Sequence, residues 1–375
     1  MKAVHFGGGN IGRGFIGQVL CENNISVTFV DVNDKIIEEL NSRGSYNVEI
    51  ADTGKVVEVS AVDGINNGKN PDAVIEAIKE ADIVTTAIGP KVLPFIAPLI
   101  AGGIEERKMS EKSAIDIIAC ENMIGGSEYL KSEVVKYINE ECLDYMETHV
   151  GFPNAAVDRI VPMQQHEDQL FVSVEEYREW VIDKTMMKND GLKLTGVKYV
   201  EDLEPYIERK LFTVNTGHAT VAYEGFSKGY KTILEAINHE DIEEKLRAVL
   251  DETGSLMIKK WGFDSKEHTL YIEKIIKRFK NKNIIDDITR VARTPIRKLG
   301  RHERFIQPLV ELKESNLSYE AILDTIGKVF NYNFKEDEES VVLQKMLKEK
   351  TSEEVIREVT ALEDIELINE IKNKL

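Results

Sequence analysis

Two kinds of hydrophobic pattern divide the chain. Up to about residue 190, short apolar runs alternate with segments whose apolar residues recur at helical spacing. The expected strands are residues 3–6, 26–30, 83–87 and 114–119, and the expected helices between them are 15–21, 35–42 and 74–80. Strands that alternate with helices predict βαβ units and a mostly parallel sheet.

Helical patterns dominate the second half. A turn-rich tetrapeptide, Lys188-Asn189-Asp190-Gly191, lies near the change. We therefore expect an α/β domain over residues 1–192 and a mostly α-helical domain over 193–375. The last 40 or so residues are expected to be charged amphipathic helix that packs without chemistry. The other helices are expected at residues 203–228, 242–260, 266–280, 319–329 and 338–348.

A glycine-rich turn follows the first expected strand and opens the first expected helix. Its sequence, Gly7-Gly8-Gly9-Asn10-Ile11-Gly12, matches G-x-G-x-x-G. In this pattern the first glycine permits a tight turn, the second lets backbone approach a pyrophosphate, and the third lets helix pack on strand. The helix start then offers free N–H groups to phosphate. All six residues are expected to contact a dinucleotide, in a Rossmann-type doubly wound domain.

Asp31 ends the second expected strand, 19 residues after Gly12. An acid at this place can accept hydrogen bonds from the adenosine ribose hydroxyls and would repel a 2′-phosphate. NAD is therefore expected in preference to NADP. The alternative is a strand-end aspartate that caps a turn. Residues 87–90 (AIGP), after the strand at 83–87, are expected to form a further wall of the cofactor crevice.

Composition narrows the partners and the compartment. The chain has 375 residues, a formal net charge of −18 and 42% hydrophobic residues. Strong negative charge disfavours nucleic acid and anionic membranes. The chain lacks a signal-peptide pattern at its start and an apolar run of membrane-spanning length. The cysteines are Cys21, Cys120 and Cys142. They are too few and too scattered for a disulfide framework or a metal site, which fits a reducing cytoplasm.

A dehydrogenase also needs a base for the alcohol proton and donors for the developing carbonyl oxygen. The cysteines and seven histidines show no spacing suited to catalytic zinc, so no metal is expected. Tyr206 and Lys210 match the Tyr-x-x-x-Lys pair of short-chain dehydrogenases. That alternative is weakened because Lys193 occupies the place of the expected serine, and because the chain is too long for that class.

Lys210 offers another mechanism, in which the lysine itself is the acid and base. At about 100° per residue, Lys210, Asn215 and His218 fit one broad helical face. Burial or a neighbouring cation lowers a lysine pKa from about 10.4 towards neutrality. Asn215 can donate to the oxyanion, and His218 can orient Lys210 or a substrate hydroxyl. The alternative is a solvated lysine and an ordinary core histidine.

A basic cluster lies late in this acidic chain. Arginine suits a phosphate monoester through paired, charge-assisted hydrogen bonds. Pro295 and Gly300 suggest an irregular segment that could aim the cations into a cleft between the domains. The alternative is a solvated face that pairs with the protein's own acids. The five cations are Arg293, Arg297, Lys298, Arg301 and Arg304, and the first four are expected to bind substrate.

Separated motifs of the chain resemble the polyol-specific long-chain dehydrogenases. Lys210-x4-Asn215-x2-His218 is similar to the K-x4-N-x2-H signature of that family. Residues 151–162 (GFPNAAVDRIVP) resemble its F-P-N-x-x-V-D-R-I-x-P segment, and residues 120–122 (CEN) its C-[DE]-N element. Several motifs in the same order are far more specific than any one of them.

Two further segments resemble the branch of the family that acts on mannitol 1-phosphate. They are residues 1–17 (MKAVHFGGGNIGRGFIG) and residues 206–218 (YIERKLFTVNTGH). One departure is Gly8, where alanine is usual in the family. It should be harmless, because glycine only adds conformational freedom.

The resemblance implies a metal-independent mechanism and assigns residues to it. Lys210 would be the general base in polyol oxidation and the general acid in ketose reduction. Asn122 and Asn215 would form the oxyanion hole, and His218 would assist Lys210. Asp158 is similar to a family acid near the active site, although it could equally form an ordinary ion pair with the next residue, Arg159.

The expected reaction is D-mannitol 1-phosphate + NAD⁺ ⇌ D-fructose 6-phosphate + NADH + H⁺. The alternative within the same family is reduction of a hexuronate, fructuronate or tagaturonate. A second alternative is a non-catalytic NAD-binding regulator, which would need no lysine base.

Overall fold

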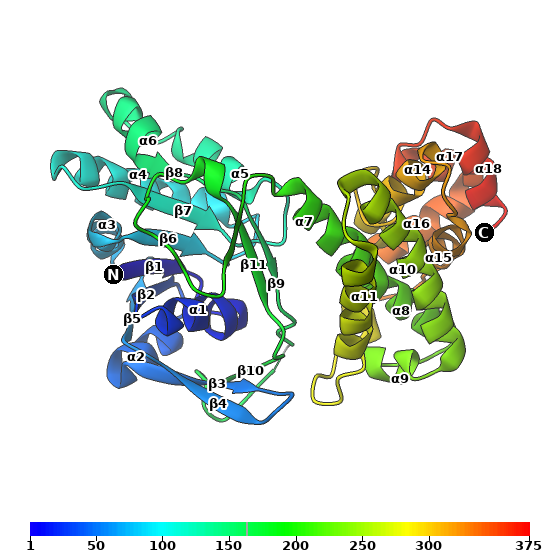
Figure 1. Ribbon diagram of the computed structural model, residues 1–375, viewed down its shortest axis with the longest axis horizontal. Coiled ribbons are helices and arrows are strands. Elements are labelled where there is room, and N and C mark those ends of the chain that lie inside the picture. Colours follow the sequence, from blue (N-terminus) through cyan, green and yellow to red (C-terminus); the bar gives the residue numbers. More distant parts are fainter. Residues whose placement is uncertain (163) are drawn as a thin grey trace. The chain divides into compact units, whose positions relative to one another are not determined.

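The computed structural model describes residues 1–162 and 164–375, which divide into two units, Met1–Glu204 and Pro205–Leu375 (Figure 1). The first unit contains a parallel sheet of six strands. These strands are β1 (Lys2–Phe6), β2 (Ser26–Asp31), β5 (Val62–Asn66), β6 (Ile83–Thr86), β7 (Ile115–Ala119) and β8 (Val150–Gly151).

The order of the strands identifies the sheet type. They lie in the order β5-β2-β1-β6-β7-β8, and every neighbouring pair is parallel. Numbered along the chain within this sheet, the order is 3-2-1-4-5-6, that of the Rossmann dinucleotide-binding fold. The order reverses between β1 and β6, and ligands of such sheets bind at the carboxyl ends of the strands there.

Both faces of this sheet are covered, because successive residues of a strand enter different apolar clusters. Ala3 of β1 and Ile118 of β7 belong to one cluster, whereas Val4 and Ile117 belong to the other. The first cluster includes η1 (Gly12–Gly17), α1 (Gln18–Glu22) and α2 (Asp34–Arg43). The second includes α3 (Pro71–Glu80), α4 (Leu93–Met109), α5 (Gly126–Val134) and α6 (Leu143–His149). The doubly wound fold expected from the sequence is confirmed.

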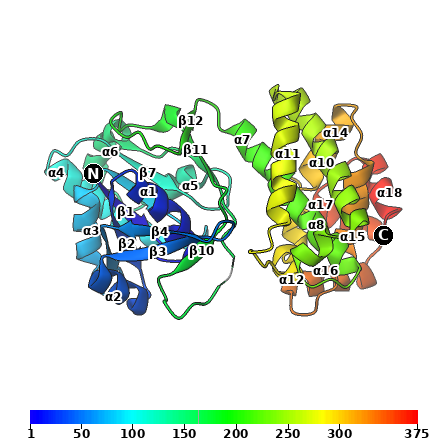
Figure 2. The ribbon, with the colours of Figure 1, turned by 60° about the horizontal axis from the view of Figure 1, so that its bottom comes forward.

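Two small sheets complete the first unit (Figure 2). One has the order β10-β3-β4 and the other β12-β11-β9. The apolar pattern did not predict their strands, which range from largely exposed in β4 to mostly buried in β11. They are β3 (Ser45–Ile50), β4 (Lys55–Ser60), β9 (Ala155–Asp158), β10 (Val172–Val174), β11 (Glu179–Asp183) and β12 (Lys198–Val200), with short 3₁₀ turns at η2 (Glu140–Cys142) and η3 (Lys184–Met186).

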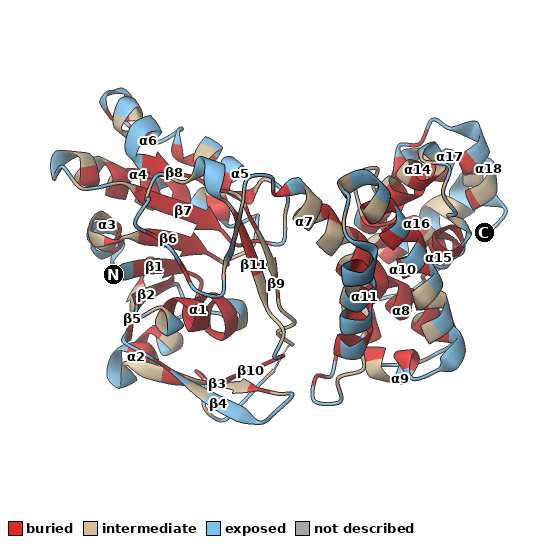
Figure 3. Ribbon diagram, viewed as in Figure 1, coloured by how far each residue is buried: buried red, intermediate tan, exposed pale blue. Residues whose placement is uncertain are grey.

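The second unit is helical, as expected. The helix α8 (Thr216–Ser227) packs against α9 (Ile233–Ile237), α10 (Glu240–Trp261), α12 (Ile288–Ala292) and α15 (Glu320–Phe330), and Figure 3 shows the burial of α8 and α10. The remaining helices are α11 (Ser265–Phe279), α13 (Pro295–Lys298), α14 (Ile306–Glu314), α16 (Glu338–Glu349), α17 (Ser352–Thr360) and α18 (Ile365–Lys372).

The helix expected over residues 203–228 has a more complex structure. It consists of α7 (Glu204–Arg209), a π-helical segment η4 (Lys210–Asn215) and α8. The spacing of about 100° per residue assumed above is therefore wrong for η4. Its hydrogen bonds join residues five apart, which brings Lys210 and Asn215 closer to one face than an α-helix would.

No helix within residues 1–162 and 164–375 has both the length and the apolar composition to cross a membrane.

Candidate active site

The glycine turn has the geometry that its sequence predicts. Gly7 has φ +113°, and a Cβ atom there would lie 2.7 Å from the carbonyl oxygen of Ala87. A Cβ on Gly12 would overlap the carbonyl oxygen of Gly7, so a side chain cannot fit where η1 meets β1. Gly9 is exposed and has open space where its side chain would be. The three glycines therefore permit the turn, the packing and the approach of a ligand.

Asp31 lies against this turn. Its Oδ2 accepts a hydrogen bond from the backbone N–H of Gly8 at 2.7 Å, and its Oδ1 accepts one from Asn33 at 2.9 Å. Alanine is usual at the position of Gly8 in the polyol-specific long-chain dehydrogenases. Its Cβ would lie 3.0 Å from Cγ2 of Ile36. Glycine at this position avoids that tight contact and keeps the carboxylate beside the turn.

Two buried side chains that the motif does not include support the turn. The guanidinium of Arg13 donates to the carbonyl oxygens of Gly8 and Leu170. His5 bonds through Nδ1 with Thr85 Oγ1 at 2.7 Å, and burial lowers its pKa to about 3. His5 is therefore a neutral support beneath the start of η1.

The carboxyl ends of β6 and β7 are joined by Glu121. Its Oε2 accepts from the Thr86 hydroxyl at 2.7 Å, and its Oε1 from the Ile88 N–H at 3.0 Å. Burial raises the pKa of Glu121, and these hydrogen bonds oppose that shift. Glu121 thus fixes the expected wall at residues 87–90, and the next residue, Asn122, is exposed at the same edge.

Asp158 is buried at the end of β9. Arg159 donates to the carbonyl oxygens of Glu175 and Gly14 and to Oε1 of Gln18 at 2.7 Å. These bonds tie the segment after β9 to η1.

The lysine motif lies on a helix that is otherwise buried. Among residues 212–225, all of which the structure describes, every residue is buried except Asn215 and His218. Lys210 is half-buried at the start of η4. The three polar residues of the motif therefore occupy the partly open positions of η4 and α8. A π-helical segment is frequent at functional sites, because it changes the direction of side chains.

His218 has partners that its spacing could not predict. Its Nε2 is 3.1 Å from Oδ2 of Asp286, and its ring stacks on Phe279 with centroids 4.8 Å apart. Asp286 is buried and also bonds to Arg290. Burial raises the pKa of Asp286, but hydrogen bonds from His218 and Arg290 outweigh it and hold the pKa at about 2. Asp286 could not be identified from motif spacing, because it is distant from His218 along the chain.

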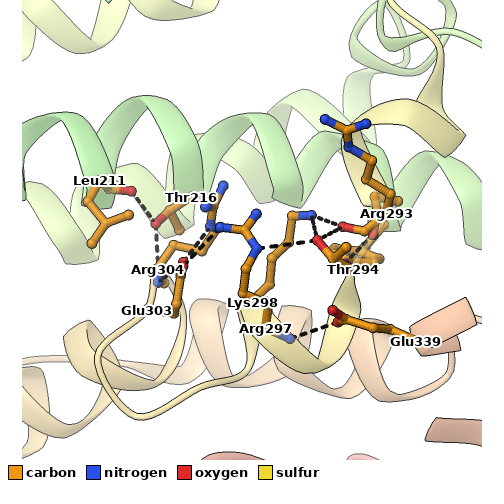
Figure 4. A network of polar contacts seen from close by, with 11 residues as sticks. Leu211, Thr216, Arg293, Thr294, Arg297, Lys298, Glu303, Arg304 and Glu339 are labelled. Atoms are coloured by element: carbon orange, nitrogen blue, oxygen red, sulfur yellow. Dashed lines mark hydrogen bonds and ion pairs between the residues drawn. The ribbon is translucent and has the colours of Figure 1, made fainter. Parts of the chain in front are cut away.

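Four of the five expected cations lie in a polar network around α13, and Arg293 takes part in it through its backbone oxygen (Figure 4). Lys298 and Arg304 are buried, whereas Arg293 and Arg297 are exposed. The Nζ of Lys298 donates to the backbone oxygen of Arg293. Burial lowers the pKa of Lys298 to about 6, and the positive charges of Arg304 and Arg297 contribute to this shift. A cation at this place is costly unless an anion joins it.

Acids offset only part of this charge. Glu303 pairs with Arg297 and with Arg304, each at 3.1 Å. Among the described residues no carboxylate pairs with Lys298. Arg301 instead lines a pocket of about 260 Å³, with Lys313 and other residues of α14 and the α17–α18 connection.

Within the described part of the chain, no three His, Cys, Asp or Glu side chains are grouped to hold a metal ion.

The whole chain matches one family of proteins. Residues 1–196 match the family model described as mannitol dehydrogenase Rossmann domain, and residues 202–375 that described as mannitol dehydrogenase C-terminal domain. The mannitol-1-phosphate 5-dehydrogenase of Lactiplantibacillus plantarum is 59% identical over 99% of this chain and 97% of its own length. That of Streptococcus mutans is 57% identical over 99% and 97%.

Solved structures share the fold at low identity. A substrate-free D-sorbitol dehydrogenase has a TM-score of 0.82 and 18% identity, covering 99% of this chain and 92% of that one. Mannitol 2-dehydrogenase of Pseudomonas fluorescens, in a ternary complex with NAD and D-mannitol, has a TM-score of 0.75 and 19% identity, covering 98% and 87%. The resemblance first seen in separate motifs is confirmed, and the chain belongs to the mannitol dehydrogenase family.

Proposed function

We propose that this oxidoreductase interconverts D-mannitol 1-phosphate and D-fructose 6-phosphate, with NAD(H) as hydride carrier and a lysine as acid and base. The observation that carries the proposal is the link between two features of the second unit. The Lys210 motif and the buried basic segment are joined directly, since the Thr216 hydroxyl of α8 donates to the carbonyl oxygen of Arg304 at 2.7 Å (Figure 4).

The cofactor site is proposed at the carboxyl edge of the large sheet. Backbone at Gly9, Asn10 and Ile11 is open to a pyrophosphate, and the helix start provides free N–H groups. Each oxygen of Asp31 accepts one backbone bond and has a further lone pair for a ribose hydroxyl. We expect Asp31→Ser to narrow the preference for NAD over NADP, measured as the ratio of kcat/KM values.

The lysine mechanism assigns a role to each residue of the motif. Lys210 takes the hydroxyl proton in polyol oxidation and returns it in ketose reduction. Asn122 and Asn215 donate hydrogen bonds to the oxygen that gains charge, and His218 assists Lys210. Nicotinamide supplies and accepts hydride when bound. This chemistry needs no metal, so EDTA is expected to leave turnover unchanged.

The phosphate site is proposed at Lys298 and Arg304, with Arg293 and Arg297 beside them in the chain. Arg301 and Asp158 are also proposed to bind the substrate. Buried cations are rare without a partner, and a phosphate dianion would provide one. An arginine fork binds two phosphate oxygens at once. The relatives named mannitol-1-phosphate 5-dehydrogenase, at 57–59% identity, support this choice of substrate.

The test follows NADH absorbance with fructose 6-phosphate, unphosphorylated fructose, fructuronate and tagaturonate in parallel. The proposal expects oxidation of NADH with fructose 6-phosphate and a far lower kcat/KM with fructose. Preference for either uronate would instead support a hexuronate reductase. Binding of NADH without turnover of any of the four would support a regulator.

A further inference from the structure

Asp286 is buried at the end of the loop before α12. The residue is 5% exposed, and its backbone oxygen accepts the N–H of Ile233 at 2.9 Å. The carboxylate points to His218, with Oδ2 3.1 Å from Nε2. A buried carboxylate beside a motif histidine has no part in the mechanism proposed above.

This carboxylate is ionised at neutral pH. Arg290 bonds to both of its oxygens, at 2.5 Å each. With His218, this guanidinium outweighs the effect of burial and keeps the pKa of Asp286 at about 2. An ionised carboxylate only accepts hydrogen bonds. The His218 nitrogen that faces it must therefore carry a hydrogen.

The imidazole is also held in its plane. The ring of Phe279 lies against it with an interplanar angle of 14°. Stacking fixes the tilt of the ring, and the bond to Asp286 fixes its rotation about χ2. The side chain of His218 remains 17% exposed, so part of the ring is open.

We propose that Asp286 is a positioning residue that sets the tautomer of His218. The proton on Nε2 faces Asp286, so neutral His218 has its lone pair on Nδ1. That lone pair accepts a hydrogen bond from the Lys210 ammonium or from a substrate hydroxyl. In the opposite tautomer an N–H would point to these donors and could not accept. This inference rests on the proposed function of Lys210 and His218.

The test combines nitrogen NMR with kinetics of the full-length protein. In protein labelled with ¹⁵N-histidine, His218→Gln identifies the His218 signals. We expect the Nε2–H tautomer in wild type and a mixture in Asp286→Asn, because an amide both donates and accepts. With fructose 6-phosphate, kcat should fall about 10–100-fold, as when the partner that orients a metal-binding histidine is removed. The dissociation constant of NADH should not change.

Two control variants separate positioning from folding. Asp287→Asn removes the same charge from the next, exposed residue and should keep the wild-type tautomer and kcat. Arg290→Gln disturbs the buried pair but leaves the carboxylate, so it should keep the Nε2–H tautomer. An unchanged tautomer in Asp286→Asn, or an unchanged kcat, would overturn the inference. If wild type did not reduce fructose 6-phosphate, the proposed function would fail, while the tautomer result would still be measured.

Discussion

The hydroxyl of Thr216 donates to the carbonyl oxygen of Arg304 at 2.7 Å, and it also lies 2.9 Å from the carbonyl oxygen of Leu211 in η4. Thr216 is fully buried and follows Asn215 directly. One side chain thus joins the π-helical segment to the basic segment. A shift of either would be transmitted to the other through this bond.

Thr216→Val tests this link. The substitution keeps the shape of the side chain but leaves the carbonyl oxygen of Arg304 without its donor. Such a loss costs about 1–3 kcal/mol in the free energy of unfolding. If Arg304 helps to bind phosphate, KM for fructose 6-phosphate should rise several-fold while the dissociation constant of NADH stays unchanged.

Thr220→Val is the matched control for that variant. Thr220 is equally buried on α8, but its hydroxyl bonds within the helix, to the carbonyl oxygen of Thr216 at 2.9 Å. It should lower stability without a selective rise in KM. The same KM change in both variants would show that the Arg304 link has no special role.

Lys210→Ala tests the acid and base. Removing a general acid–base group typically lowers the rate about 10²–10⁴-fold. We expect kcat to fall in that range in both directions, while NADH still binds with its wild-type affinity. Stopped-flow or steady-state absorbance at 340 nm would measure the rate, and NADH fluorescence the binding. Near-normal turnover would refute the assignment of Lys210.

The sequence predicted the glycine turn and most large helices, because their signals are local. The tight turn at Gly7 and the packing at Gly12 follow from residues a few positions apart. The π-helical turn at Lys210 was not predictable from apolar spacing, which assumes an α-helix. That turn alters the direction of Asn215 relative to Lys210.

Other features of the site depend on tertiary contacts, which spacing along the chain does not reveal. Asp286 became visible only when folding placed it beside His218. The basic cluster was expected from composition, but the burial of Lys298 and Arg304 was not. Charge counting treats all five cations alike, whereas burial separates those that need an anion from those that water can solvate.

Lys298 is expected to take up a proton when phosphate binds. Its pKa is lowered to about 6, so at pH 7.5 it is mostly neutral in the free protein. A phosphate dianion favours the charged form and raises the pKa. Calorimetry at pH 7.5 in buffers of different ionisation enthalpy should report uptake approaching one proton per fructose 6-phosphate bound. Lys298→Met should abolish the uptake, and Lys313→Met should not.

The same shift predicts how stability depends on pH without ligand. Between a pKa of about 6 and the ordinary lysine value of 10.5, the unfolded chain holds this proton and the folded chain does not. The contribution of Lys298 to the free energy of unfolding therefore rises with pH across that window. Denaturation of wild type and Lys298→Met at pH 6, 7.5 and 9 would measure it. Equal pH slopes in the two proteins would contradict the prediction.

Gly9 and Gly12 should respond in opposite ways to the same added methyl group. A Cβ on Gly12 would overlap the Gly7 carbonyl and lie 2.7 Å from His5 Nε2, so β1 and η1 would have to separate. Overpacking of this kind typically costs about 1–3 kcal/mol, and Gly12→Ala should lower Tm accordingly. A Cβ on Gly9 would have no neighbour within 4 Å, so Gly9→Ala should keep Tm.

NADH binding then separates the two glycines further. The methyl group of Gly9→Ala would stand where backbone approaches the pyrophosphate, and it should weaken NADH binding at unchanged stability. Differential scanning fluorimetry with and without NADH measures both effects. A wild-type affinity for NADH in Gly9→Ala would argue against a pyrophosphate at this turn. A wild-type Tm in Gly12→Ala would show that the strand and helix can separate without cost.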